Sequence, residues 1–381
     1  MLSEVIFNIE SIFILFFIGT FFITYVIIPM IIGVAEYKNY TDKPNNRSSH
    51  KRSVPTLGGV AFFITLILSF LFMNDWNVSN ISIFVIPGLA ILFLTGLKDD
   101  LVVLSPASKL TAQLLAVVFV ISNSAMQIQD FNGFLGIGRM PLLLIFPVTT
   151  LFMIVIINAY NLIDGIDGLA SLIGIIISIT FGIGFYLLGY YYFTILSIII
   201  FAMLIAFLRY NLSYEKKIFM GDTGSLIIGF MISILTIRFL AIEPCKLEEL
   251  PMYIENIPVV VMAILIVPVF DLGRVFLIRI MSKKNPFKPD RNHAHHILID
   301  LGLSHPKASF ILGLFNILFI ILFIILGMYV SSITLLLIFI GLIFILLYAF
   351  YRLDSSFTNL KKRISNKRKV KDLKSKIFTN K

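Results

Sequence analysis

Acidic side chains, amides and histidines are concentrated in a few short polar breaks between the long apolar runs of this sequence. Asp99 and Asp100 follow one apolar run, Asp164 and Asp167 follow another, and Asp222 precedes a third. Ionisable groups beside membrane-length apolar segments are costly and mark functional sites. Several carboxylates on one face indicate a divalent cation with oxygen ligands, and interleaved Lys, Arg and His indicate phosphate. The two together predict phosphoryl transfer.

The segment Asn158–Leu169 carries the densest of these motifs. Asn158 and Asn161 are three residues apart, so they share one face of a helix end. Asp164 and Asp167 follow, each with a glycine after it that permits close backbone approach. A helix cap would account for one of the acids but not for four polar groups. We therefore interpret this segment as functional.

Three shorter motifs each have a structural explanation as well. Gly96–Asp100 could be a helix exit with a solvated turn. Phe219–Leu226 could supply the N-cap of the next helix, although a helix N-terminus also favours anions, so that capping and cation binding are compatible. His50–Arg52, which precedes Pro55–Gly59, could be ordinary charge on the cytosolic side. Each of these motifs is weak when it is taken alone.

The segment Asp290–His296 gathers three of the five histidines of the chain. A zinc site is the obvious alternative, but a helical zinc pair places its histidines at i and i+4, and no Cys or Glu lies nearby in the sequence. Arg291 among the histidines fits phosphate better. We therefore take His293, His295 and His296 as candidates for contacts with an anionic substrate.

The composition indicates that lipid is the solvent of this chain. Of 381 residues, 58% are hydrophobic and 14% are charged, about half the charged share of a soluble domain. We expect residues 1–351 to form a single membrane domain and residues 352–381 a basic tail. The prediction is an all-α polytopic membrane protein with about eleven transmembrane helices, or ten if the sixth and seventh runs are one, at 10–33, 57–73, 81–97, 110–122, 142–160, 169–187, 191–208, 224–241, 257–280, 308–327 and 331–351.

The distribution of Lys and Arg predicts the orientation. Alternate loops and the C-terminal tail hold 26 of the 31 Lys and Arg residues, which places them in the cytosol. We therefore expect the N-terminus outside, the C-terminus in the cytosol and the active site on the cytosolic face. Glu4 and Glu10 before the first run argue against a cleavable signal. The tail is expected to rest on anionic membrane lipid, and not on nucleic acid.

Taken in order, five motifs resemble those of the polyprenyl-phosphate N-acetylhexosamine-1-phosphate transferases. The pattern Arg-x-His-x-His-His is similar to the WecA/TagO-like branch, whereas the peptidoglycan-precursor branch has three consecutive histidines. The resemblance implies a UDP-N-acetylhexosamine donor, in the first place UDP-GlcNAc, and not UDP-MurNAc-pentapeptide. The motifs are Pro55–Gly59, Gly96–Asp100, Asn158–Leu169, Phe219–Leu226 and Arg291–His296.

The resemblance also implies a role for each matching acid and amide. Asp222 matches a magnesium ligand, and Asn161 matches a second metal ligand of some members. Asp99 and Asp100 match paired catalytic acids near the lipid phosphate and the metal. Mg²⁺ is therefore the implied cofactor, with Mn²⁺ as the alternative ion.

Other matching residues are implied to bind the substrates. Asp164 and Asp167 match positions near the nucleotide, with Asp167 toward uracil, and Asn158 belongs to the same substrate-binding motif. Lys51 and Lys109 match basic residues near the phosphates. The residues of the last motif match the loop that contacts the donor pyrophosphate and sugar, namely Arg291, His293, His295 and His296. Asp271, in Pro268–Asp271, lies in a segment that resembles the family without an assigned role.

The expected reaction is transfer of a sugar 1-phosphate to undecaprenyl phosphate with release of UMP, in the cytoplasmic membrane of a bacterium. The resemblance is also compatible with a homodimer. A transporter is the first alternative, but it would place polar groups at the bilayer midplane. A non-catalytic scaffold is the second, but it would be expected to have lost one of the acids. The same reaction with another UDP-N-acetyl sugar, or with UDP-MurNAc-pentapeptide, stays open.

Overall fold

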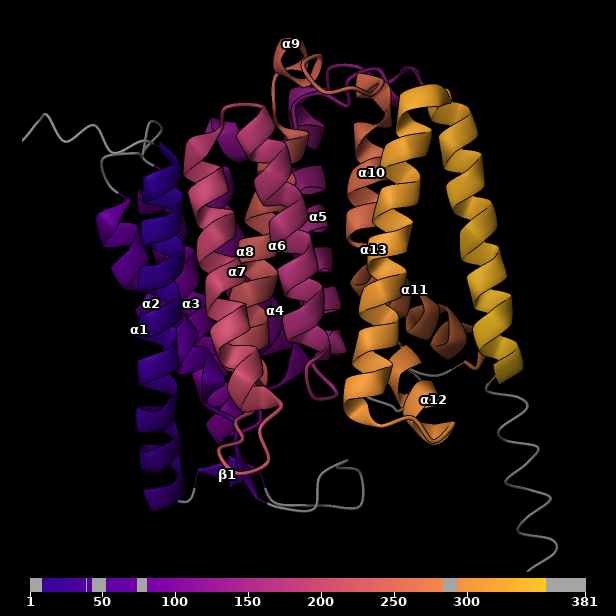
Figure 1. The fold of residues 1–381 in the computed structure, drawn as a ribbon. Helices are drawn as coiled ribbons and strands as arrows, with labels where there is room; N and C mark the ends of the chain where they lie inside the picture. The colour runs from indigo at the N-terminus through magenta and orange to yellow at the C-terminus, as the bar shows by residue number, and fades with distance from the viewer. Residues whose placement is uncertain (1–8, 39, 43–52, 74–80, 284–292, 354–381) are drawn as a thin grey trace, which may run out of the picture.

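The computed structural model is almost entirely helical, and its long helices lie side by side in one bundle (Figure 1). The structure describes residues 9–38, 40–42, 53–73, 81–283 and 293–353. Two of the predicted substrate-binding residues, Lys51 and Arg291, lie outside the described residues, as does the basic tail from residue 354 onward.

The helices follow the apolar runs of the sequence, and polar segments separate most of them. In chain order they are α1 (Ile9–Tyr37), α2 (Gly58–Phe72), α3 (Ile81–Leu101), α4 (Pro106–Ile121), α5 (Leu142–Ile163), α6 (Leu169–Leu187), α7 (Tyr191–Asn211), α8 (Gly221–Leu240), α9 (Pro244–Leu247), α10 (Ile257–Ile264), α11 (Ile266–Met281), α12 (Ala294–Asp300) and α13 (His305–Tyr329). A further helix covers Ser332–Leu353. The 3-10 helices η2, η3 and η4 cover Ser124–Met126, Phe134–Gly136 and Ile254–Asn256, and β1 (Thr41–Asp42) pairs antiparallel with β2 (Val54–Pro55).

Eight of the described helices are long and apolar enough to cross a membrane. The helices α10 and α11 pass the same test only together, as a pair bent by 71°. Two more apolar helices are shorter, with 15 residues in α2 and 16 in α4. The prediction of an all-α polytopic membrane protein is confirmed, and each predicted run coincides with helix. The ninth run, which was expected to be one continuous helix, is instead broken into two.

The break between α10 and α11 has a local cause. Pro268 has no N–H, so the carbonyl of Ile264 lacks its usual partner four residues on. The side chain of Asn316 in α13 takes that place, because its Nδ2 donates to the Ile264 oxygen at 3.2 Å. The unpaired carbonyl is thus satisfied from a neighbouring helix, and α11 turns away from the direction of α10 (Figure 1).

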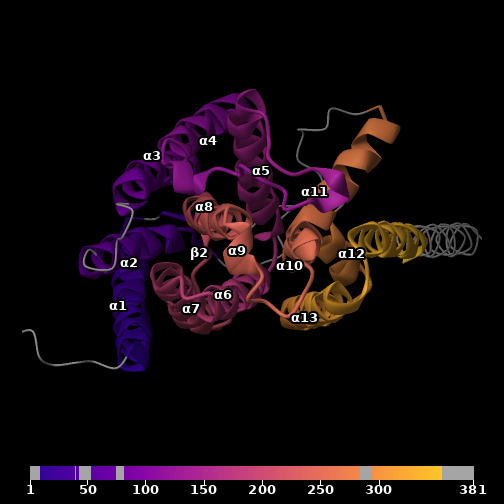
Figure 2. The same ribbon diagram turned by 90° about the horizontal axis from the view of Figure 1, so that it is seen from above.

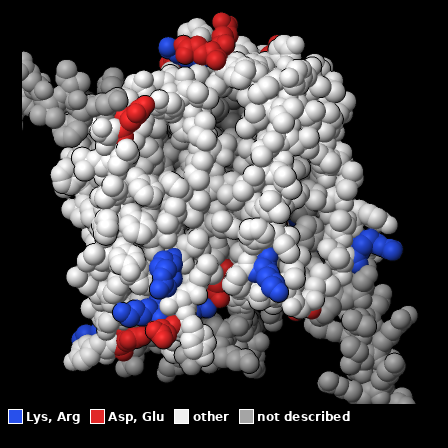
Figure 3. Space-filling model, in the orientation of Figure 1, with Lys and Arg blue, Asp and Glu red and all other residues white. Residues whose placement is uncertain are grey.

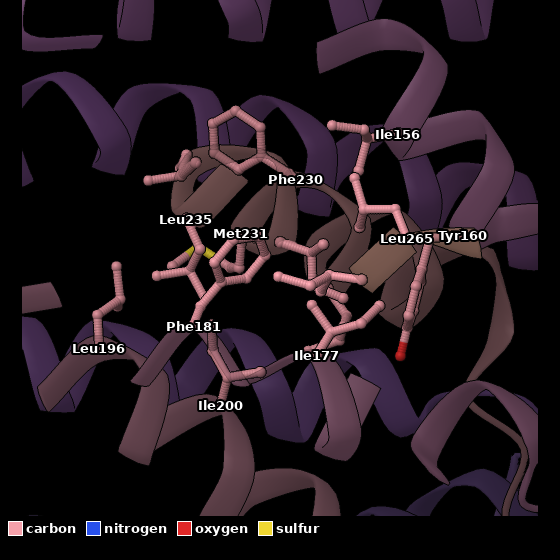
Figure 4. Packing of buried hydrophobic residues seen from close by; sticks show 14 of the residues in the cluster. Ile156, Tyr160, Ile177, Phe181, Leu196, Ile200, Phe230, Met231, Leu235 and Leu265 are labelled. Atoms are coloured by element: carbon pink, nitrogen blue, oxygen red, sulfur yellow. The ribbon is translucent and has the colours of Figure 1, made fainter. Parts of the chain in front are cut away.

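The core of the bundle is α8, which is surrounded by α2, α3, α5, α6 and α7 (Figure 2). Every residue from Thr223 to Leu240 is buried. Figure 4 shows Phe230 and Leu235 of α8 among side chains of the neighbouring helices, such as Phe181 of α6. A helix that is apolar all round belongs in the interior. From Thr223 onward α8 is therefore enclosed by its neighbours, whereas Gly221 and Asp222 at its start are only partly buried.

Two glycines allow α2 and α3 to approach the start of α8. A Cβ atom at Gly59 would lie 2.2 Å from the backbone nitrogen of Gly224, and one at Gly96 would lie 2.4 Å from the Cα of Thr223. In addition, the amide of Gly59 donates to the carbonyl of Met220 at 3.1 Å. The Pro55–Gly59 motif thus clamps the segment that precedes α8. Its contribution to the site is through the backbone.

Candidate active site

The charged side chains of the described chain are gathered at the two ends of the bundle, with an almost uncharged belt between them (Figure 3). Lys and Arg are prominent at the lower end of this view, where the first residues of α8 and α13 and the last residues of α5 are found (Figures 1 and 3). The predicted acids Asp99, Asp164 and Asp222 come from this end. Asp99 and Asp222 are joined there through Lys109, and with Lys109 and Asn161 they form one cluster.

Asp222, in the first turn of α8, is the centre of that cluster. Its Oδ1 accepts a hydrogen bond from Nδ2 of Asn161 at 2.7 Å and lies 3.3 Å from Nζ of Lys109. Lys109 also forms an ion pair with Asp99, whose Oδ1 accepts the backbone N–H of Leu104 at 2.6 Å. Four helices, α3, α4, α5 and α8, each contribute one side chain. The structure thus brings together four residues that were predicted separately, and their roles stay predictions.

Asp100, although it is next to Asp99, has a different set of partners. Its Oδ1 accepts the backbone N–H of Asp222 at 2.8 Å, and its Oδ2 accepts both the N–H and the hydroxyl of Thr223, at 3.0 and 2.5 Å. An anion at a helix N-terminus is stabilised by the unpaired amides and the helix dipole. The cap of α8 therefore comes from α3, and not from Asp222 or Thr223 as the motif suggested. Asp100 holds Asp222 in place.

Asn158, which was predicted to bind substrate, is occupied by protein contacts. Its Nδ2 donates to Oε1 of Gln113 at 2.7 Å and to the carbonyl of Ile154 at 2.8 Å. Gln113 is 2% exposed and was not identified from the sequence. Its position four residues after Lys109 on the same face of α4 is the signal that could have found it. The amide pair fastens α4 to α5 about one turn from the cluster.

Asp164 lies in the turn between α5 and α6, and no described residue donates a hydrogen bond to its carboxylate. Burial and the nearby carboxylates of Asp222, Asp100 and Asp167 raise the pKa of Asp164 to about 8. A buried acid surrounded by other acids favours its neutral form until a cation arrives. Its oxygens are thus available to a ligand that brings positive charge.

Asp167, three residues further on, belongs to a separate group. Its Oδ2 lies 2.7 Å from Nζ of Lys217 and 2.9 Å from Nδ1 of His305. Burial would raise the pKa of Asp167, but the hydrogen bonds from His305 and Lys217 outweigh it and hold that pKa below its usual value. Ser309 Oγ also donates to its carbonyl at 2.8 Å. Sequence reasoning assigned no role to these three partners.

One of the predicted histidines, His295, lies against the turn between α5 and α6. His295 is 2% exposed, and a Cβ atom at Gly165 would lie 2.2 Å from its Nε2. The rings of His293 and His295 are nearly parallel, at 10°, with centroids 5.6 Å apart. Burial lowers the pKa of His295 to about 3, so that its imidazole is neutral at physiological pH. His293–His296, which we call the histidine loop, are thus in contact with the turn between α5 and α6 through His295 and Gly165.

Within the described ranges, no group of three or more His, Cys, Asp or Glu side chains has the geometry of a metal site. The side chains around Asp222 nevertheless include the carboxylate of Asp99 and the amide of Asn161, whose Nδ2 faces Asp222. Carboxylate and amide oxygens are the ligands that Mg²⁺ takes. Mg²⁺ is usually bound by only one or two protein carboxylates, and water and substrate phosphates complete its shell. Asp222, Asn161 and the partner-free Asp164 therefore fit this ion chemically, and Lys109 is the one cation that pairs with Asp222 in the described structure.

Comparison with known proteins gives a consistent result. Residues 82–240, which include α3 to α8, match the model of glycosyl transferase family 4. Over 334 residues the chain is 31% identical to a probable undecaprenyl-phosphate N-acetylglucosaminyl 1-phosphate transferase of Bacillus subtilis, covering 87% of this chain and 90% of that protein. Undecaprenyl-phosphate alpha-N-acetylglucosaminyl 1-phosphate transferases of Thermotoga maritima and Escherichia coli are 29% and 27% identical, over 69% and 74% of this chain and 74% and 75% of their own lengths.

Proposed function

The chain belongs to glycosyl transferase family 4, and on this premise we propose that it transfers N-acetylglucosamine 1-phosphate from UDP-GlcNAc to undecaprenyl phosphate. The family assignment agrees with the resemblance drawn from the five sequence motifs. The observation that carries the proposal is the convergence of Asp99, Lys109, Asn161 and Asp222 at one end of a bundle of membrane helices. The names of the relatives supply the lipid and the sugar.

The reaction exchanges one phosphoanhydride bond for another. An oxygen of the lipid phosphate forms a bond to the β-phosphorus of UDP-GlcNAc. The bond from that phosphorus to the bridging oxygen breaks, and UMP leaves with the electron pair. A phosphate monoester has its second pKa near ~6, so the attacking oxygen is largely deprotonated at neutral pH without a base. Since Asp99 is already paired with Lys109, we assign it to positioning rather than to proton removal.

Charge is the main obstacle, because both substrates are anions that meet beside a cluster of carboxylates. Lys109 supplies one positive charge at this place. We propose Mg²⁺, or Mn²⁺ as the alternative, held by Asp222 with Asn161 and Asp164 beside it. Such an ion would offset the charge that develops on the leaving UMP. The role of Asp100 is then to hold the backbone of Asp222 in place.

The position of the site fits two substrates of opposite solubility. The residues of the cluster lie at the ends of apolar helices, where a water-soluble nucleotide and a phosphate on a membrane-embedded chain can meet. From the distribution of Lys and Arg we place this end on the cytosolic face of a bacterial cytoplasmic membrane. Contacts from Arg291, His293, His295 and His296 to the donor remain part of the proposal, as does a homodimer.

A donor screen tests the proposed function. The purified protein in detergent is given undecaprenyl phosphate and Mg²⁺, and UMP release is followed with UDP-GlcNAc, UDP-GalNAc and UDP-MurNAc-pentapeptide, with and without EDTA. We expect release that depends on the metal and on UDP-GlcNAc. Release with another sugar alone would overturn the donor and keep the reaction. The absence of release from folded protein with every donor would favour a non-catalytic scaffold.

A further inference from the structure

The bent segment α11 carries a buried acid that the proposed mechanism has not used. Asp271 is 2% exposed. Its Oδ2 lies 2.7 Å from Nδ1 of His293, and its Oδ1 accepts the backbone N–H of Ala294 at 2.7 Å. Both oxygens of one carboxylate are thus directed at two consecutive residues of the histidine loop. Such a pair of contacts fixes the side chain and the backbone of that loop at the same time.

We propose that Asp271 is a positioning residue, which holds His293 with its proton on Nδ1 and leaves Nε2 for the donor substrate. This inference rests on the proposed function and adds a residue to it. An ionised carboxylate can only accept hydrogen bonds, so the nitrogen that faces it carries the proton. The outer nitrogen then accepts a hydrogen bond when the ring is neutral and donates one to phosphate when the ring is charged. Carboxylates that orient a functional histidine in this way are common beside metals.

The fold supplies the geometry for this contact through the break between α10 and α11. Asp271 follows Pro268 by three residues and is the sixth residue of α11, so it lies in the second turn after the bend. The bend is supported by Asn316, which donates to the Ile264 carbonyl. Because α11 leaves the direction of α10 by 71°, its second turn brings Asp271 to His293 and Ala294 at the start of α12. A straight ninth helix would place this acid elsewhere.

A second contact restrains His293 on its other side. Its ring is nearly parallel to that of His295, which in turn packs against Gly165 in the Asp164 turn. His293 is 6% exposed, so its ring has little freedom to rotate. Asp271 therefore connects the bend in the membrane helix to the surface that faces Asp164. The link runs through His293 and through the backbone of Ala294.

A double-mutant cycle tests whether Asp271 acts through His293. The variants are Asp271→Asn, His293→Ala and the two combined, with kcat and KM measured for UDP-GlcNAc and for undecaprenyl phosphate. Asparagine keeps an oxygen for Ala294 but offers no second carboxylate oxygen to His293. We expect Asp271→Asn to lower kcat/KM for the donor by about 10- to 100-fold, with the acceptor KM unchanged. The double variant should be no worse than His293→Ala, because the two residues act as one unit.

The assignment would be overturned if the two losses in kcat/KM multiply in the double variant, or if Asp271→Asn has wild-type kinetics. Asp130→Asn is the matched control, since Asp130 also accepts a backbone N–H, from Asn132 at 2.6 Å, but at the opposite end of the bundle. It should leave both KM values unchanged. Asp271→Glu retains a carboxylate, and activity above that of Asp271→Asn is expected.

If the Asp271 variants fail to fold, a measurement on the protein with Asp271 intact still tests the proposal. The protein is labelled with ¹⁵N-histidine, and the His293 signals are assigned by their loss in His293→Ala. We expect Nδ1 to carry a proton, and a proton on Nε2 alone would overturn the proposal. This result does not depend on turnover. If no donor releases UMP, the proposed function fails while the tautomer of His293 is still decided.

Discussion

Lys109 bridges two carboxylates that come from different helices, because its Nζ pairs with Asp99 of α3 and lies 3.3 Å from Oδ1 of Asp222 of α8. The side chain of Lys109 thus brings a positive charge to the place where the acids of the cluster converge. Asn161 joins the same oxygen of Asp222 from the other side. The cluster is therefore held by one cation and one amide before any substrate arrives.

The first prediction concerns Lys109→Gln. We expect turnover to fall by about two to three orders of magnitude, because one fixed positive charge beside the reacting phosphates is lost. UMP release under saturating substrates measures the effect. Lys246→Gln is the control, since Lys246 forms an exposed ion pair with Glu249 on the other end of the bundle. Equal turnover of the two variants would contradict a role for Lys109 at the phosphates.

The second prediction separates the role of Asp222 from that of Asp100. Asp222→Asn should abolish turnover and remove any stabilisation of the protein by Mg²⁺, while the protein remains folded. Asp100→Asn should retain part of its activity, because an amide oxygen can still accept one of the N–H groups of the α8 N-terminus. The expected cost is that of a weakened helix cap, about 1 kcal/mol. Turnover by Asp222→Asn would disprove the metal assignment.

The third prediction concerns the pH dependence of stability at Asp164. Its pKa is about 8 in the folded protein against an ordinary value of 3.8. Between these values the folded state holds a proton that the unfolded state has released, so the stability should fall as the pH rises from about 4 to 8. Asp164→Asn should remove this decline. Thermal unfolding in EDTA across that range checks it, and an unchanged slope in the variant would refute it.

The fourth prediction has the opposite sign, at Asp167. The pKa of this carboxyl is held below 3.8 by His305 and Lys217. Its contribution to stability is therefore complete above about pH 4 and is lost as the pH falls through the lowered pKa. Asp167→Asn should lower the unfolding midpoint at pH 7, and the difference from the parent protein should shrink in acid. A difference that grows below pH 4 would exclude this explanation.

The fifth prediction tests the approach of α2 to α8. Gly59→Ala places a methyl group 2.2 Å from the backbone nitrogen of Gly224, so the helices must separate. We expect a loss of about 1–3 kcal/mol together with lower turnover, since Asp222 lies two residues before Gly224. Gly33→Ala in α1 is the matched control, because no atom lies within 4 Å of the added Cβ. Loss of stability in both variants would point to general damage rather than to this contact.

The helices could be predicted well because lipid imposes long apolar runs, and those runs end at polar residues. The bend in the ninth run could not. Pro268 is visible in the sequence, but the 71° turn also depends on Asn316, which comes from a helix some fifty residues later. A helix break that is satisfied from another element is a property of the fold.

The residues of the candidate site could likewise be predicted only in part. The acids were identified because charge beside an apolar run is unusual. The role of each carboxylate depends on the direction in which its side chain points. Asp99 and Asp100 are neighbours in sequence, but Asp99 faces Lys109 and Asp100 faces the N-terminus of α8. The partners that sequence reasoning missed are ordinary in composition and became visible only through contacts; they are Gln113, Lys217, His305 and Ser309. The roles predicted for Lys51 and Arg291 stay predictions.

The complete burial of α8 has a consequence for how the bilayer acts on this protein. Changes in membrane thickness deform helices that touch lipid, and they do so at a cost of fractions of a kcal/mol per ångström of mismatch. α1 and the Ser332–Leu353 helix are largely exposed on the outside of the bundle, whereas α8 has no residue there from Thr223 onward. The position of Asp222 is thus insulated from the lipid composition, which reaches it only through the tilt of the helices that enclose it.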